Sequence, residues 1–206
     1  MFKVISATAL AAGLLFAAPV AAEPFDTFHD LCFATHGDRP AAHAEAKRRG
    51  WTEIPTEALG DMAEEMFREL VMHTNFNPAT GEATDGAPGL LLTGWGDGEE
   101  MMGAESVVVE ICSLMSPELE LEDAEQRLTA LVGARAVAPD EEKMWLYSRV
   151  DGRYVSEAAL QEFAGGEIEA VARQRDLYVA FAMEDDGARV LMLGAVRSVL
   201  RLREGR

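Results

Sequence analysis

The two cysteines are the residues whose chemistry the sequence defines most clearly. Cys32 and Cys112 are the only cysteines in this chain of 206 residues. Oxidation would join them in a disulfide that closes a long loop and restricts the unfolded chain. The alternative is two separate buried thiols, because a free cysteine packs as a small apolar residue. We expect a structural disulfide, since no Cys-x-x-Cys redox motif is present.

The segment 93–103 is the most site-like part of the chain. It holds Trp95, Asp97 and Glu99 among several glycines. Surface loops with such side chains often carry binding sites. We therefore take these three residues as a candidate binding loop. The more ordinary alternative is a long hairpin loop whose tryptophan folds back on the core.

The histidines and methionines give no clear metal-binding pattern. The first three histidines recur every seven residues: His29, His36 and His43. The Gly-Asp-Arg-Pro sequence at 37–40 keeps them off one continuous helix, and a zinc site needs three or four ligands at short spacings. Met62 and Met66 would share one helical face, where thioethers suit Cu(I), although methionine also fills gaps in ordinary cores. We expect no cofactor and keep copper handling as an alternative.

No catalytic motif emerges from the sequence. A Gly-x-Ser-x-Gly nucleophile turn, a Walker motif and a dinucleotide-binding glycine pattern are all missing from the chain. Carboxylates are so numerous that no pair stands out for acid–base chemistry. We therefore favour a non-catalytic protein, with a hydrolase that uses Asp97 or Glu99 together with a histidine as the alternative.

The N-terminus has the three parts of a secretory signal peptide. Lys3 is followed by an apolar stretch at 4–18, and Val20 and Ala22 occupy the positions that a signal peptidase reads. We expect cleavage after Ala22. An uncleaved anchor is the alternative, because the apolar stretch is just long enough to cross a bilayer. Cleavage would deliver the protein to the periplasm or the medium, where thiols oxidise and no stable membrane anchor remains.

Composition limits the possible partners. The chain has 36 acidic and 18 basic residues and a formal net charge of −18. Such a surface repels phosphate backbones and anionic lipids, so nucleic acid is excluded as an expected partner. An unknown protein or small molecule remains. The length of the segment 23–206 fits a single globular domain.

Helices precede strands in the expected order of elements. Helical spacing is found in four main segments: 25–35, 39–49, 56–70 and 121–131. Loops are expected at 75–89 and 94–103. Strands are expected at 90–93, 106–115, 144–150, 153–155, 177–183 and 188–196. The last four strands form two hairpins, with turns at Asp151-Gly152 and at 184–187. The sequence predicts an α+β fold in which N-terminal helices pack on a mainly antiparallel sheet with C-terminal hairpins. The function that we expect is binding in the cell envelope.

Overall fold

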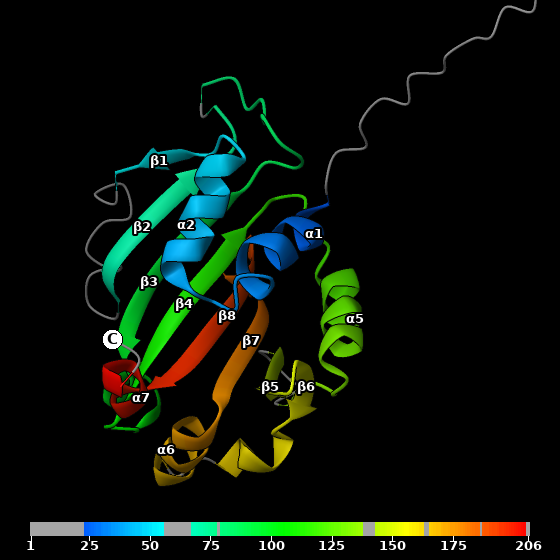
Figure 1. Ribbon diagram of the computed structural model, residues 1–206. Helices are drawn as coiled ribbons and strands as arrows, with labels where there is room; N and C mark the ends of the chain where they lie inside the picture. Colours follow the sequence, from blue (N-terminus) through cyan, green and yellow to red (C-terminus); the bar gives the residue numbers. More distant parts are fainter. Residues whose placement is uncertain are drawn as a thin grey trace, which may run out of the picture.

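One antiparallel sheet organises the computed structural model, which describes residues 23–55, 67–77, 79–137, 143–162, 165–185 and 187–204. The strands in chain order are β1 (Thr52–Ile54), β2 (Arg68–Thr74), β3 (Leu90–Asp97), β4 (Val107–Met115), β5 (Lys143–Val150), β6 (Arg153–Ser156), β7 (Asp176–Asp185) and β8 (Ala188–Ser198). They form an eight-stranded sheet in the order β1-β2-β3-β4-β8-β7-β5-β6, shown in Figure 1. Each neighbouring pair is antiparallel, which confirms the expected α+β class.

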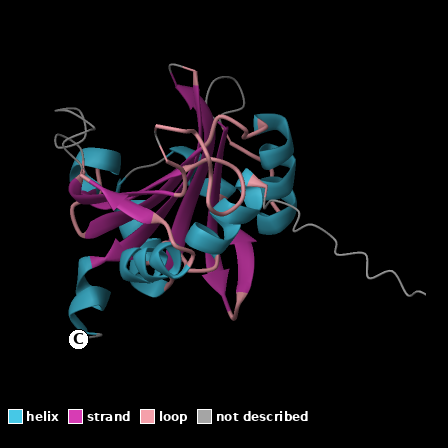
Figure 2. Cartoon of the chain, turned by 90° about the horizontal axis from the view of Figure 1, so that it is seen from above, coloured by secondary structure: helices cyan, strands magenta, loops and turns pink. Residues whose placement is uncertain are grey.

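Helices lie on both sides of this sheet, as Figure 2 shows. They are α1 (Pro24–Phe28), the π-helical turn η1 (His29–Phe33), α2 (Arg39–Arg48), α4 (Gly98–Met102), α5 (Leu121–Val132), the 3₁₀ turn η3 (Ala158–Glu162), α6 (Gly165–Gln174) and α7 (Val199–Glu204). We call the side covered by α1, η1, α2 and α5 the first face, and the side covered by α4 and α6 the second face. None of the helices in the described ranges is long and apolar enough to cross a membrane.

Capping residues mark the bounds of α2 and α5, which lie within one residue of the predicted ranges 39–49 and 121–131. The side chain of Asp38 accepts a hydrogen bond from the backbone N–H of Ala41 at 2.8 Å, so it caps the start of α2. The chain leaves α2 through Gly50, whose φ is +80°. Gly133, with φ +66°, likewise ends α5. Only glycine adopts these left-handed conformations without strain.

Both predicted hairpins are confirmed. Strands β5 and β6 pair up to Val150 and Arg153, across a turn in which Asp151 and Gly152 have φ values of +50° and +75°. Positive φ at both central residues is the geometry that follows the natural twist of two strands. Strands β7 and β8 pair along their length and turn at Gly187, which has φ +80°.

The prediction of a helix at 56–70 is wrong for the residues of this segment that the structure describes. Residues 56–66 lie outside the described ranges, and Leu70 belongs to strand β2. This strand pairs with β1 on one side and β3 on the other, and Met72 and His73 on its opposite faces are both buried. A strand buried on both faces loses the alternating pattern that identifies strands in sequence.

The prediction of a loop at 94–103 is also wrong. Strand β3 continues to Asp97, and α4 follows directly. The glycines there meet a steric need: a Cβ on Gly94 would lie 2.7 Å from Leu70 Cδ2, and one on Gly98 would lie 2.3 Å from Val107 Cγ2. Glycine therefore marks close approach of neighbouring chain segments at these positions.

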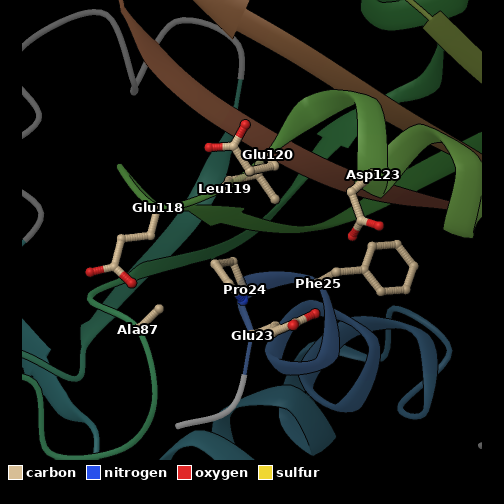
Figure 3. A pocket seen from close by; sticks show the side chains of 8 residues that line it. All are labelled: Glu23, Pro24, Phe25, Ala87, Glu118, Leu119, Glu120 and Asp123. Atoms are coloured by element: carbon tan, nitrogen blue, oxygen red, sulfur yellow. The ribbon is translucent and has the colours of Figure 1, made fainter.

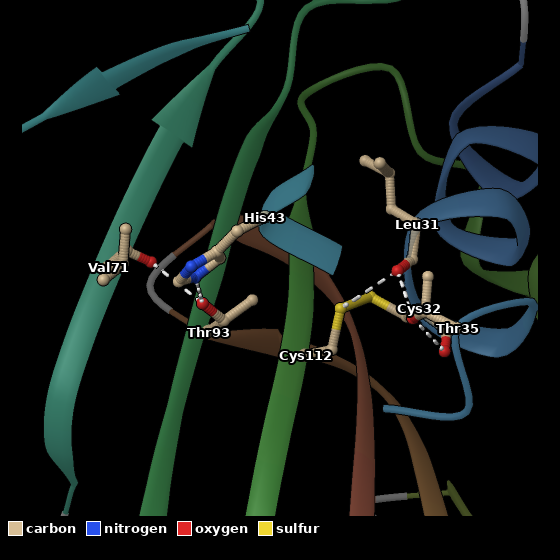
Figure 4. Close-up of a disulfide and its surroundings, with 7 residues drawn as sticks. All are labelled: Leu31, Cys32, Thr35, His43, Val71, Thr93 and Cys112. Atoms are coloured by element: carbon tan, nitrogen blue, oxygen red, sulfur yellow. Dashed lines mark hydrogen bonds between the residues drawn. A yellow bond between two sulfur atoms is a disulfide. The ribbon is translucent and has the colours of Figure 1, made fainter. Parts of the chain in front are cut away.

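The Cys32–Cys112 disulfide joins η1 to the central strand β4, as Figure 4 shows. Its Cα atoms are 5.5 Å apart, and both residues are fully buried. Thr35 ends the helical turn by donating its hydroxyl to the carbonyl of Leu31 at 2.6 Å. The predicted disulfide is therefore present in the structure, and it fixes the N-terminal helices against the first face.

Two arginines hold the turn that follows η1. Arg149 Nη1 lies 2.7 Å from His36 Nε2, and Arg197 Nη2 donates to the carbonyl of His36 at 2.9 Å. Arg197 also donates Nε to Glu110 at 2.6 Å. His36 has a positive φ of +56°, and a Cβ on Gly37 would lie only 3.0 Å from Ala195 Cβ. The turn therefore lies directly on the sheet.

Removing the disulfide should destabilise the protein strongly. The bond spans 80 residues, and loop entropy for that length corresponds to about 4.5 kcal/mol. We expect the Cys32→Ala/Cys112→Ala double variant to lose stability of this order in urea unfolding. Reductant should lower the stability of the wild type but leave the double variant unchanged. Equal urea midpoints for the two proteins under oxidising conditions would contradict the structural role.

Candidate functional site

The candidate site lies on the second face of the sheet, opposite the disulfide. Successive side chains of a strand point to opposite faces, so Cys112 of β4 contacts the N-terminal helices and its neighbour Ile111 points away from them. The strand register then places apolar residues in rows across the second face. One row consists of Leu146, Val179, Gly194 and Ile111.

A cavity of about 300 Å³ lies over this row. The adjacent row of Leu177, Val196 and Val109 extends its floor. Helix α4 contributes Met101 and Met102 to its walls, and α6 contributes Ile168. For comparison, an engineered apolar cavity of about 150 Å³ binds benzene. The volume therefore suits a small organic molecule.

The absence of a side chain at Gly194 keeps the middle of the floor open. A Cβ at this position would lie 2.8 Å from Val179 Cγ1 and 3.2 Å from Val109 Cγ1. Gly194 has no positive φ, so its backbone conformation does not explain the glycine. We conclude that glycine is required here by space, in the centre of an otherwise bulky apolar surface.

Methionines form much of the cavity's outer side. Four of the five lining residues that keep some exposure are methionines, and the set is Met101, Met102, Met144, Met192 and Phe181. Methionine side chains are unbranched and polarisable, so they adjust to ligands of different shape. The lining side chains carry no charge and no hydrogen-bonding group. This arrangement can hold a hydrocarbon group, and the lining itself supplies no nucleophile or base.

Trp95, the central residue of the predicted binding loop, lies on the first face. It is part of β3, and the guanidinium of Arg68 lies 5.3 Å from the centre of its ring. An open hollow of about 530 Å³ borders it, with Arg39, Glu69 and Glu110 among its lining residues. Ion pairs already use these charges, since Arg39 Nη2 lies 2.6 Å from Glu69 Oε2 and Glu110 binds Arg197.

Asp97 and Glu99 have a local structural role. The carboxylate of Asp97 accepts a hydrogen bond from the backbone N–H of Glu99 at 3.0 Å and so begins α4. These two residues therefore help to position Met101 and Met102 in the cavity wall, although neither lines it. The sequence analysis selected this segment for its polar residues, whereas its methionines line the cavity.

An acidic hollow of about 360 Å³ surrounds Pro24, as Figure 3 shows. Glu118, Glu120 and Asp123 contribute carboxylates to it. Arginines neutralise part of this charge: Arg127 contacts Asp123, and Arg189 lies 3.3 Å from Glu120. Across the described ranges, no group of three or more His, Cys, Asp or Glu residues is arranged to hold a metal ion.

Two of the four histidines meet under α2. His43 hydrogen-bonds Thr93 and lies 5.2 Å, ring centre to ring centre, from the fully buried His73 (Figure 4 shows His43 and Thr93). Burial, and then the nearby His73, lowers the pKa of His43 to about 4. Burial also lowers the pKa of His73. Both rings are therefore neutral at pH 7.

The histidine pair should make the fold less stable in mild acid. An unfolded histidine takes up a proton near pH 6.5, whereas folded His43 does so only near pH 4. Stability should therefore fall as the pH drops from 6.5 toward 4, because the unfolded chain binds the additional proton. His43→Gln should flatten this decline in urea titrations at several pH values. An unchanged slope in that variant would show that other groups cause the pH dependence.

The family of the chain is not indicated by comparison with known proteins. No family model matches the sequence, and no curated protein or solved structure matches it either.

Proposed function

We propose that this protein is exported and that it binds a small apolar molecule in the cavity on the second face. The observation that carries this proposal is a recess of about 300 Å³ lined only by apolar side chains. Apolar pockets of this size are the usual form of small-molecule sites. The proposal keeps the expected binding role and selects a small molecule as the partner.

A peptide fits this recess poorly. Its backbone N–H and C=O groups would lose water without gaining partners, because the lining side chains offer no hydrogen bonds. An aliphatic or aromatic group loses nothing of this kind on entry and gains the full benefit of leaving water. The flexible thioethers of Met101, Met102, Met144 and Met192 can then close around it.

Export is supported by the disulfide. Cys32 and Cys112 are joined and fully buried, and such bonds persist mainly in oxidising compartments. Residues 1–22, which the sequence assigns to a signal peptide, lie outside the described ranges. The periplasm or the extracellular medium is therefore the proposed location.

A neutral fluorescent probe tests the binding role. We expect N-phenyl-1-naphthylamine to bind the purified protein at one site with increased emission. Val179→Phe places a larger side chain into the cavity and should weaken binding by at least about tenfold, which is about 1.4 kcal/mol. Because it fills space, this variant should keep or raise the thermal unfolding temperature.

Val155→Phe is the matched control, since Val155 is 42% exposed on β6 and lies outside the cavity. It should bind the probe like the wild type. A folded Val179→Phe variant with unchanged probe affinity would show that the cavity is not the binding site.

Intact-mass measurement tests export. When the full chain is expressed in a bacterium with a secretion pathway, we expect the exported protein to begin at Glu23 and to be lighter than its reduced form by two hydrogens (about 2 Da). Val20→Leu/Ala22→Leu replaces the small residues that the peptidase reads and should block the cleavage. Cytosolic protein with an unprocessed start and two reactive thiols would contradict this location.

A further inference from the structure

Methionine is concentrated at the cavity on the second face. The described ranges contain seven methionines, and four of them line this one cavity: Met101, Met102, Met144 and Met192. All four residues are partly exposed, whereas Met72 of strand β2 is only 2% exposed. A small reagent in the surrounding solution can therefore reach the cavity methionines.

No thiol competes with these thioethers for an oxidant. Cys32 and Cys112 are the only cysteines of the chain, and the disulfide takes up both. Exposed thiolates are otherwise the sulfur atoms that an oxidant attacks most readily. Methionine is therefore the main sulfur target in this protein, and burial protects Met72.

We propose that the four cavity methionines are a site of reversible oxidation by hydroperoxides that releases the bound molecule, an inference that rests on the proposed binding role of the cavity. The thioether sulfur attacks one peroxide oxygen, and the O–O bond breaks. The sulfur gives up two electrons and keeps that oxygen. The other oxygen takes the proton and leaves as water or, from an organic hydroperoxide, as an alcohol. The product is methionine sulfoxide, which dedicated reductases convert back to methionine.

A sulfoxide does not suit the apolar lining. Its oxygen accepts hydrogen bonds, and the lining side chains offer no donor. Burying a polar group without a partner is unfavourable, so the oxidised side chain turns its oxygen toward the solvent. This movement withdraws apolar surface from the bound molecule. A ligand that is held only by apolar contact gains nothing in return.

The fold does not depend on these four side chains. Met144 and Met192 lie on β5 and β8, whose backbones are both paired with β7. Met101 and Met102 lie on α4, which begins at the cap formed by Asp97. The disulfide and the larger group of helices belong to the opposite face of the sheet. Oxidation therefore acts on ligand binding and leaves the protein folded.

Probe binding before and after treatment with hydrogen peroxide tests this inference. We expect peptide mass maps to show sulfoxides, each adding about 16 Da, at the four cavity methionines. The affinity for N-phenyl-1-naphthylamine should fall at least about tenfold. Treatment with methionine sulfoxide reductases A and B should restore it. Circular dichroism should show a folded protein throughout.

A variant without these sulfur atoms should resist the treatment. Met101→Leu/Met102→Leu/Met144→Leu/Met192→Leu keeps apolar side chains of similar volume in the lining. Whatever its affinity before treatment, peroxide should change that affinity by less than about twofold. Met101→Leu/Met102→Leu alters α4 alone and should lose less affinity on oxidation than the wild type. This smaller variant decides the test if the fourfold variant does not fold or does not bind the probe.

Met115→Leu/Met183→Leu is the matched control. These two methionines are also partly exposed, but they lie outside the cavity lining. The control variant should lose probe affinity on oxidation by the same factor as the wild type.

Each result has a distinct meaning. If the untreated wild type binds the probe and its cavity methionines oxidise without loss of affinity, this inference is overturned and the binding role stands. Oxidation of Met115 and Met183 alone also overturns it, as does unfolding of the oxidised protein or equal loss of affinity in the leucine variants. If the untreated wild type does not bind the probe, the proposed function itself fails, and this inference fails with it.

Discussion

The need to cover both faces of a wide sheet governs this structure. On the first face, α1, η1, α2 and α5 form a continuous core that includes the aromatic rings of Phe28, Phe33 and Tyr147. The buried disulfide ties that layer to the central strand β4. The second face receives the short helix α4 and the helix α6. Because these two helices cover less area, an apolar recess remains between them and the strands.

The recess departs from the close packing of protein interiors, because it is partly open to the surface. Its volume of about 300 Å³ lies at the lower end of the range of small-molecule pockets. Its floor is rigid, because Val109, Ile111 and Val179 belong to central strands paired on both sides. Its outer side consists of methionines, which adapt. The cavity therefore combines a floor of paired strands with adaptable side chains on its outer side.

Much of the fold was predictable because its signals are local. A capping aspartate at Asp38, the Asp-Gly turn at 151–152 and the β-branched run of β4 each act over a few residues. The failures share one cause, which is that neighbours distant in sequence override local preference. Gly94 and Gly98 indicate a loop when read alone, but they make room for Leu70 and Val107. The last three residues of strand β2 are buried on both faces, which hides its alternation.

The sequence by itself determined the two partners of the disulfide, since the chain has no other cysteine, and the ends of several helices and hairpins. Only the tertiary structure decided where the apolar cavity lies. The cavity joins Ile111, Met144, Val179 and Gly194, which are spread over more than eighty residues and meet only through the register of β4, β8, β7 and β5. A shift of one residue would turn each side chain to the opposite face. Strand pairing, which depends on the whole chain, therefore forms the site.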